Sequence, residues 1–349
     1  MKLGIMMQWA EPQVAIDVAK VQLAEKLGYD SLWTAEIYGQ DAITPLAFYA
    51  AHTKHIRLGT GVIQCAARTP ASTALSMATV DAMGGGDRVI IGVGLSGPQI
   101  VEGWYGQPWG RPNRRLRDYV TIMRKILKRE APVSHESDEI MLPYEGPGSS
   151  GLGKPLKSVL HVNPDIPIYC GTGNQANVTL TAELADGWLP MGYNPDSAHI
   201  FKPWLEKGFA RAGGGKGWDD FAIQAGCQVL LCDDVAAGLA SFKPFLGYYV
   251  GGMGARDKNF HKEAMARRGF AEEAERVQEL FLAGKREEAY AAIPDEYVDQ
   301  GALVGPKERI RERFRAWQDL GVDGLTINGV QTPEILAMMA EIADLKPRD

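Results

Sequence analysis

Segments that favour β-strands alternate with segments that favour helices along almost the whole chain, and this alternation constrains the fold most strongly. Short apolar runs each lead into a turn and then into a helix-like segment. Strands are expected at 2–6, 31–33, 57–61, 88–92, 166–170, 187–189, 222–231 and 324–328. Such alternation requires right-handed crossovers and a parallel sheet. Eight units close most naturally as a (β/α)8 TIM barrel of the α/β class.

Local signals place the helices between these strands. A helix over 70–83, for example, begins at Pro70 and is stopped by the glycines at 84–86. The other helices are expected at 14–27, 44–52, 114–129, 177–185, 197–212, 306–320 and 333–345. A doubly wound open sheet is the alternative, but such sheets usually carry a GxGxxG turn after the first strand. Here Met7-Gln8-Trp9 follows that strand, which favours the barrel.

Two insertions interrupt the rhythm of a single domain that spans residues 1–349. Residues 130–165 are rich in proline and glycine, which predicts a long loop or hairpin. A loop of this length is longer than a simple connection between a strand and a helix requires. The second insertion covers about 240–300. Within it, residues 255–292 predict a polar helical stretch with a solvated face.

Composition limits the classes of function. The chain has 349 residues, is 45% hydrophobic and carries a net charge of -6, which argues against a nucleic-acid partner. It has no apolar run long enough to span a bilayer and no signal peptide, so we expect a cytoplasmic protein without a membrane partner. The four cysteines form no CxxC pair, and the six histidines lack metal-ligand spacing, so we expect reduced thiols and no metal site.

Two loop regions favour a ligand at the mouth of the barrel. The strands within 57–104 end in loops rich in glycine, serine and threonine, which would form a floor and a wall for a flat polar ligand. A second region, 168–177, reads as a strand, a glycine-rich turn and the start of a helix. Free N–H groups at a helix N-terminus bind anions, and Gly171 and Gly173 would let the backbone approach closely.

The chain resembles a known family over nearly its whole length. The matching segments are GYDSLWTAE at 28–36, RLGTGVIQCAARTP at 57–70, GVGLSGPQIVEGWYG at 92–106, ADGWLP at 185–190, YVGGMGARDKNF at 249–260 and LVGPKERIRER at 303–313. With these segments the chain resembles the bacterial luciferase-like flavin and deazaflavin oxidoreductases, and most closely the branch that uses coenzyme F420. The resemblance implies a barrel, a homodimer and a hydride carrier lying across the carboxyl ends of the strands.

The resemblance also assigns residues to the ring of the coenzyme. It implies a non-proline cis peptide between Gly61 and Val62, which forms a bulge behind the ring. Gln64 follows this bulge, and its amide would bond a ring carbonyl or a ring nitrogen. The loop with Gly94, Ser96 and Gly97 would border the ring and the substrate. Some relatives carry a glutamate proton donor near the position of Gly97; this chain does not, which disfavours a sugar-phosphate reaction.

The turn after the fifth expected strand would hold the phosphate-bearing tail of the coenzyme, as the matching turn does in the family. The residues assigned to it are Gly171, Thr172, Gly173, Asn174, Ala176 and Asn177. The basic residues Arg111, Arg114, Arg115 and Arg117 would attract this tail over a distance or would form an ordinary solvated helix face.

Glu36 is the candidate catalytic residue. Relatives often have Asp-His where this chain has Ala35-Glu36. Glu36 is therefore the titratable side chain at the end of the second expected strand. Desolvated by Trp33 and Trp9, its carboxyl group could serve as an acid or a base. A surface carboxylate paired with a cation is the alternative.

These residues together predict an enzyme that moves a hydride between F420 and a small organic substrate, an alcohol, a carbonyl compound or an enone. The substrate would lie under the 130–165 insertion, with Trp9, Trp33, Trp104 and Tyr105 as candidate walls. Two alternatives remain open: an FMN-dependent luciferase-like monooxygenase, and an F420-binding protein without turnover.

Overall fold

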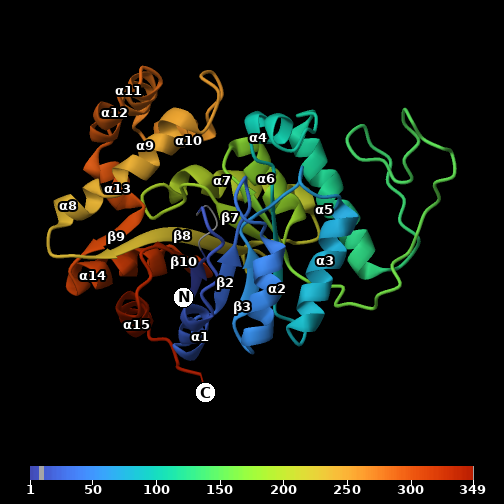
Figure 1. Ribbon diagram of the computed structural model, residues 1–349, viewed down its shortest axis with the longest axis horizontal. Coiled ribbons are helices and arrows are strands. Elements are labelled where there is room, and N and C mark those ends of the chain that lie inside the picture. The colour runs from blue at the N-terminus through green and yellow to red at the C-terminus, as the bar shows by residue number, and fades with distance from the viewer. Residues whose placement is uncertain (8–11, 349) are drawn as a thin grey trace.

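The computed structural model describes residues 1–7 and 12–348 and shows the barrel that the alternation predicts (Figure 1). Each strand pairs in parallel with its neighbours, and the sheet closes because the last strand pairs with both the first and β8. The barrel strands are β1 (Lys2–Met6), β2 (Ser31–Thr34), β3 (Arg57–Thr60), β5 (Val89–Gly94), β6 (Ile168–Thr172), β7 (Gly187–Pro190), β8 (Ala222–Leu231) and β10 (Gly324–Gly329).

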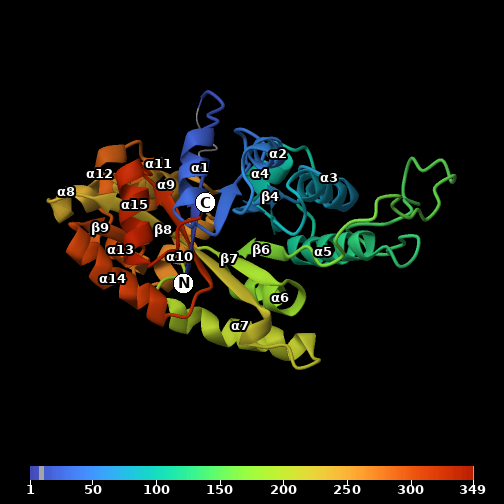
Figure 2. The same cartoon turned by 90° about the horizontal axis from the view of Figure 1, so that it is seen from below.

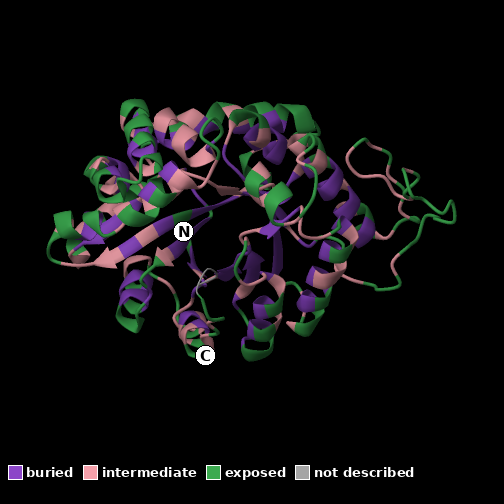
Figure 3. Cartoon of the chain, turned by 45° about the horizontal axis from the view of Figure 1, so that its top comes forward, coloured by how far each residue is buried: buried purple, intermediate pink, exposed green. Residues whose placement is uncertain are grey.

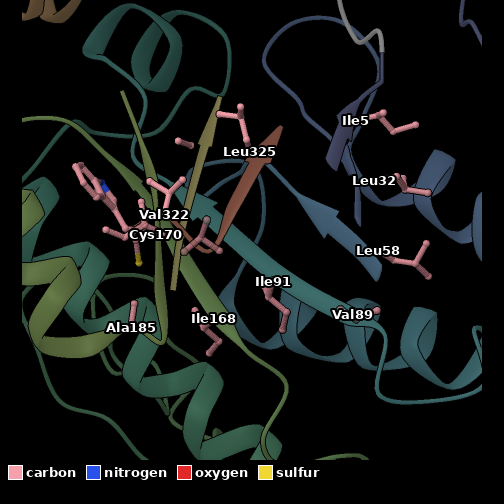
Figure 4. Packing of buried hydrophobic residues seen from close by; sticks show 14 of the residues in the cluster. Ile5, Leu32, Leu58, Val89, Ile91, Ile168, Cys170, Ala185, Val322 and Leu325 are labelled. Carbon is pink, nitrogen blue, oxygen red and sulfur yellow. The ribbon is translucent and has the colours of Figure 1, made fainter. Parts of the chain in front are cut away.

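The core lies between the barrel and its outer helices. All six residues of β5 are buried, as a strand covered on both faces requires. The register brings Leu32 opposite Leu58 and Ile91 opposite Ile168. Figure 4 shows these apolar side chains packed along neighbouring strands. The buried layer holds the strand ends in fixed positions, and a site at the mouth depends on this.

Helices connect the strands, and most of them begin and end within two residues of the predicted bounds. α3 (Pro70–Met83) matches the expected range, with the Thr69 side chain accepting a hydrogen bond from the N–H of Ser72. α1 (Val18–Lys26) begins later than expected because Asp17 caps it. The short α4 (Pro98–Gly103) was not predicted. The remaining helices outside the second insertion are α2 (Ile43–His52), α5 (Pro112–Lys128), α6 (Gln175–Leu184), α7 (Ala198–Ala212), α14 (Lys307–Asp319) and α15 (Pro333–Ile342).

The third expected strand, 57–61, ends one residue early, and a short strand that was not predicted follows it. β3 ends at Thr60, and the two-residue strand β4 (Ile63–Gln64) pairs with the distal end of β5. Between them, the Gly61–Val62 peptide is cis, as the family resemblance implied. This break turns the chain so that Val62 and Gln64 face the mouth of the barrel.

The first insertion, 130–165, contains no helix. It is held by isolated antiparallel bridges, Val133 to Leu156 and His135 to Leu142, and it extends away from the barrel beyond α5 (Figures 1 and 2).

The second insertion folds as a helical cap with its own buried cluster. The expected polar stretch at 255–292 is divided at Gly269 and Gly284, both of which have a positive φ. Figure 3 shows exposed faces alternating with buried ones on these helices. An additional strand, β9 (Ala302–Gly305), pairs with the end of β8 and was not predicted. The helices are α8 (Val235–Ala240), α9 (Lys243–Gly252), α10 (Phe260–Arg267), α11 (Ala271–Leu282), α12 (Arg286–Ala291) and α13 (Asp295–Gln300).

Candidate functional site

A cavity of about 660 Å³ opens at the carboxyl ends of the barrel strands. This is the end at which TIM barrels place their active sites. Twelve of the thirteen residues predicted for the site line it: Glu36, Gly61, Val62, Gln64, Gly94, Ser96, Gly97, Gly171, Thr172, Gly173, Asn174 and Asn177. Ala176 lines a neighbouring cavity instead.

Two glycines hold the floor of this cavity against Val62. A Cβ atom on Gly94 would lie 2.5 Å from Cγ2 of Val62, and one on Gly171 would lie 2.7 Å from Cγ1. Both distances are shorter than van der Waals contact, so the valine fits only because these neighbours have no side chain. The floor is therefore a fixed apolar surface at the ends of β5 and β6.

Gln64 presents an unused hydrogen-bond acceptor at this floor. Its Nε2 donates to the backbone carbonyl of Glu36 at 3.1 Å, which fixes the amide plane. Its Oε1 is buried and has no hydrogen-bond partner among the described residues. Because a buried acceptor without a partner costs free energy, this oxygen is suited to a ligand N–H.

Glu36 is buried beside Gln64, and its carboxylate accepts from several donors. The N–H of Gln64 donates to Oε1 at 3.0 Å, and the N–H of Ala42 donates to Oε2 at 3.1 Å. The guanidinium of Arg68 forms a close ion pair with Oε1. The carboxylate lines the cavity and at the same time ties the end of β2 to β4.

The N-terminus of α6 lies at the edge of the cavity. The side chains of Asn174 and Asn177 cap the helix reciprocally: each carbonyl oxygen accepts from the backbone N–H of the other residue, at 2.9 and 3.1 Å. Among the described residues, no acceptor contacts the N–H groups of Gln175 and Ala176. These two amides, together with the helix dipole, suit an anion.

A neighbouring cavity of about 620 Å³ continues from this helix end. Arg114, Arg117, Lys207 and Arg211 line it. Of the predicted basic cluster, Arg114 and Arg117 therefore line this cavity, and each also forms an ion pair, Arg114 with Asp138 at 3.1 Å and Arg117 with Glu183 at 2.8 Å. Arg111 and Arg115 do not line it and pair with Asp138 and Glu139 of the first insertion.

The loop after β5 forms one side of the cavity. Ser96 has a φ of 59°, in the left-handed region, and Gly97 is the N-cap residue of α4. A Cβ on Gly97 would lie 3.6 Å from the ring of Phe260. The second insertion thus reaches across to this loop.

The second insertion covers the site, and this differs from the prediction. No residue of 130–165 lines the cavity, whereas residues of 249–267 do. Of the predicted walls, Trp33 lines the cavity, whereas Trp104 and Tyr105 do not. Trp104 is 62% exposed, and the hydroxyl of Tyr105 donates to the carbonyl of Ile37. Trp9 lies outside the described residues.

His261 is the functional candidate that sequence reasoning missed. It lines the cavity, and its ring packs edge-on against Tyr249 with centroids 4.6 Å apart. Burial lowers the pKa of His261 to about 4. The segment YVGGMGARDKNF at 249–260, which matches the family, ends immediately before His261 and could have drawn attention to it. No local sequence pattern, however, indicates that this segment lies over the barrel.

Among the described residues, histidine, cysteine and carboxylate side chains do not gather in groups of three that could hold a metal ion. None of the helices in residues 1–7 and 12–348 has the length and apolar character required to cross a membrane.

Comparison with known proteins identifies relatives over nearly the whole chain. The family model described as luciferase-like monooxygenase matches residues 1–324. A Mycobacterium tuberculosis protein, provisionally named a coenzyme F420-dependent oxidoreductase, is 42% identical over 97% of this chain and 98% of its own length.

Solved structures share the fold. The coenzyme F420-dependent tetrahydromethanopterin reductase from Methanopyrus kandleri superposes with a TM-score of 0.78 at 20% identity, over 99% of both chains. An F420-dependent secondary alcohol dehydrogenase in complex with an F420-acetone adduct has a TM-score of 0.74 at 16% identity, over 98% of this chain and 97% of its own.

Proposed function

Because this chain belongs to the luciferase-like monooxygenase family, we propose that it is an oxidoreductase that transfers a hydride between coenzyme F420 and a small organic substrate. The observation that carries the proposal is the cavity floor. Val62 presents an apolar surface between two glycines, and the unpartnered Oε1 of Gln64 lies beside it. A flat heterocycle with an N–H at its edge complements both features.

The residues present fit this coenzyme at each part of the site. Val62 would support the ring, Gln64 would accept a hydrogen bond from it, and Ser96 would donate one from the loop after β5. The free amides of Gln175 and Ala176 would hold the phosphate, with Gly173 allowing close approach. The basic surface formed by Arg114, Arg117, Lys207 and Arg211 would attract the rest of the anionic tail.

The chemistry divides between the coenzyme and the protein. When bound, F420 supplies a two-electron hydride carrier, in which a carbon replaces the reactive nitrogen of flavins and so disfavours one-electron and oxygen chemistry. The chain orients the substrate over the ring and excludes water under α9 and α10. We retain Glu36 as the proposed acid or base, because its carboxylate lines the cavity beside Gln64. Alcohols, carbonyl compounds and enones are the proposed substrates.

Titration of the purified protein with F420 and, separately, with FMN tests the proposal. We expect F420 to bind with a change in its visible absorbance and FMN not to bind. Tight FMN binding with oxygen consumption would instead favour the monooxygenase alternative. F420 binding without hydride transfer to any alcohol, carbonyl compound or enone would indicate a binding protein without turnover.

We further propose that the protein acts as a single-domain homodimer in the cytoplasm. Sedimentation at equilibrium would measure the mass: a value near twice 38.1 kDa supports the dimer, and a value near 38.1 kDa excludes it.

A further inference from the structure

His261 occupies a fixed position in the cavity. Asn259, which is 3% exposed, accepts hydrogen bonds from the N–H groups of His261 and Lys262 at 2.9 and 3.0 Å. The same Asn259 donates to the carbonyls of Tyr249 and Val250 at 3.2 and 2.7 Å. This one side chain therefore holds the start of α10 against the end of α9. These bonds fix the backbone of His261, and the imidazole packs against the ring of Tyr249.

The imidazole has no polar partner in the described chain. Its ring packs against the ring of Tyr249, with an angle of 79° between the ring planes. Burial lowers its pKa to about 4, so the ring is neutral at neutral pH. A neutral imidazole carries one N–H donor and one nitrogen acceptor. Both are available to a molecule in the cavity.

The charged side chains around the cavity are already paired. Glu36 pairs with Arg68, and Glu263 contacts both Lys258 at 3.5 Å and Arg267 at 3.9 Å. Arg267 also donates to the carbonyl of Gly173 at 2.9 Å. Among the described lining residues, no unpaired charge is left to bind a charged substrate.

Apolar side chains form much of the cavity wall beside His261, and the uncharged polar side chains of Gln99, Asn113, Gln224 and Asn328 also line the cavity. Leu95 and Ile100 line it from the loop after β5 and from α4, Met191 lines it after β7, and Met253 and Phe260 line it from the second insertion. Apolar walls around one or two polar groups are typical of pockets for small, weakly polar molecules.

We propose, resting on the F420-dependent function above, that His261 contacts the substrate and that the substrate is an uncharged, largely apolar carbonyl compound or the matching alcohol. The imidazole N–H donates to the carbonyl oxygen of the oxidised form, and the other ring nitrogen accepts from the hydroxyl of the reduced form. His261 thus orients the oxygen-bearing carbon toward the coenzyme, whichever way the reaction runs.

The variants His261→Phe and His261→Gln test this role. Phenylalanine keeps a ring against Tyr249 and removes both polar atoms; glutamine keeps a donor and an acceptor. The exposed His199 on α7, changed to Phe, is the matched control. Reduced F420 is mixed with each protein and with uncharged ketones, aldehydes and cyclic enones, and in parallel with keto acids and sugar phosphates.

We expect the wild type to reduce uncharged members of the panel. The change His261→Phe should lower kcat/KM for them about tenfold or more, the loss typical of a hydrogen bond made in the transition state. His261→Gln should recover much of the loss, and His199→Phe should match the wild type. F420 affinity, measured separately by absorbance, should be the same in all four proteins.

Three results would overturn the inference. The first is wild-type kinetics in His261→Phe. The second is an equal loss in the Phe and Gln variants, which would assign His261 a packing role. The third is reduction of charged substrates alone by a protein that binds F420. Absence of F420 binding in the wild type is a different failure, because it removes the proposed function itself.

Discussion

The side chain of Val62 lies directly against the backbone of Gly171, so that a Cβ atom on Gly171 would be 2.7 Å from Cγ1 of Val62. β-branched side chains have few rotamers, so the valine cannot turn away. The end of β6 therefore fixes the position of the bulge between β3 and β4. The floor of the cavity depends on this contact, between segments more than 100 residues apart, and on the contact of Val62 with Gly94.

We expect Gly171→Ala to displace Val62 and to disturb the proposed ring site. Overpacking of this kind costs about 1–3 kcal/mol of stability, and F420 affinity should fall about tenfold or more if the floor moves. Gly103→Ala is the control, because a Cβ there meets nothing within 4 Å. Thermal unfolding and F420 titration measure the two effects. Equal affinity in both variants would contradict the role assigned to this floor.

Gln64→Leu should weaken F420 binding without unfolding the protein. Leucine nearly matches the size of glutamine but removes the Oε1 that has no partner in the described chain, together with the hydrogen bond from Nε2 to the carbonyl of Glu36. Loss of one hydrogen bond to a ligand corresponds to about 1 kcal/mol, or roughly a fivefold rise in Kd. Gln318→Leu, on the exposed face of α14, should leave Kd unchanged. An unchanged Kd in both variants would exclude Gln64 as a ring contact.

Glu36→Gln and Glu36→Ala should both lower turnover far more than F420 affinity, if the carboxylate acts as acid or base. Glutamine keeps the shape of the side chain and an acceptor for the N–H of Ala42 or Gln64, but it removes the charge that Arg68 pairs with. We expect kcat to fall by a factor of about 100, as for a general acid or base. If Glu36→Gln kept the wild-type kcat, Glu36 would not act as acid or base, and its role would be to connect the end of β2 to β4 by hydrogen bonds.

The sequence predicted those parts of the structure that local signals determine. α3 has the expected bounds because Pro70 and the glycine run after Met83 mark its ends. The turn before α6 lies where predicted because a parallel strand must end at the mouth of the barrel. The cis peptide at Gly61–Val62 came from family resemblance and not from local signals.

The cover of the cavity could not be predicted in the same way. His261 and Gly97 are far apart in the sequence, and only the packing of the second insertion brings α10 over the loop after β5. The first insertion has the more conspicuous composition, yet it projects away from the barrel (Figure 2). Composition indicates that a segment is irregular; it does not indicate which face of the barrel the segment lies on.

Replacing residues 144–153 by a short glycine–serine linker should leave F420 binding unchanged. These residues include the exposed Tyr144 and Leu152, and none of them lines the cavity. A surface segment that does not contact the ligand contributes no direct contact to the binding free energy, and surface changes of this kind are usually worth about 0.5 kcal/mol or less. The same replacement over 253–258, which contains Met253, Gly254 and Lys258 of the cover, should weaken binding. Isothermal titration measures the F420 affinity of both variants. If the 144–153 replacement weakened binding and the 253–258 replacement did not, the first insertion and not the second would cover the site.

The stability of the protein should depend on pH through His261. Burial holds its folded-state pKa at about 4, below its ordinary value of 6.5, and no charged neighbour contributes to the shift. The unfolded chain therefore binds more protons between these values. The stabilisation by the neutral ring is complete above about pH 6.5 and is lost as the pH falls toward 4.

Between about pH 7.5 and pH 5, the wild type should lose about 1–2 kcal/mol more unfolding free energy than His261→Gln does. Urea unfolding at both pH values measures this difference, with the exposed His199→Gln variant expected to follow the wild type. Parallel losses in wild type and His261→Gln would mean that the imidazole is solvated in the folded protein, and such a ring would be charged under mildly acidic conditions.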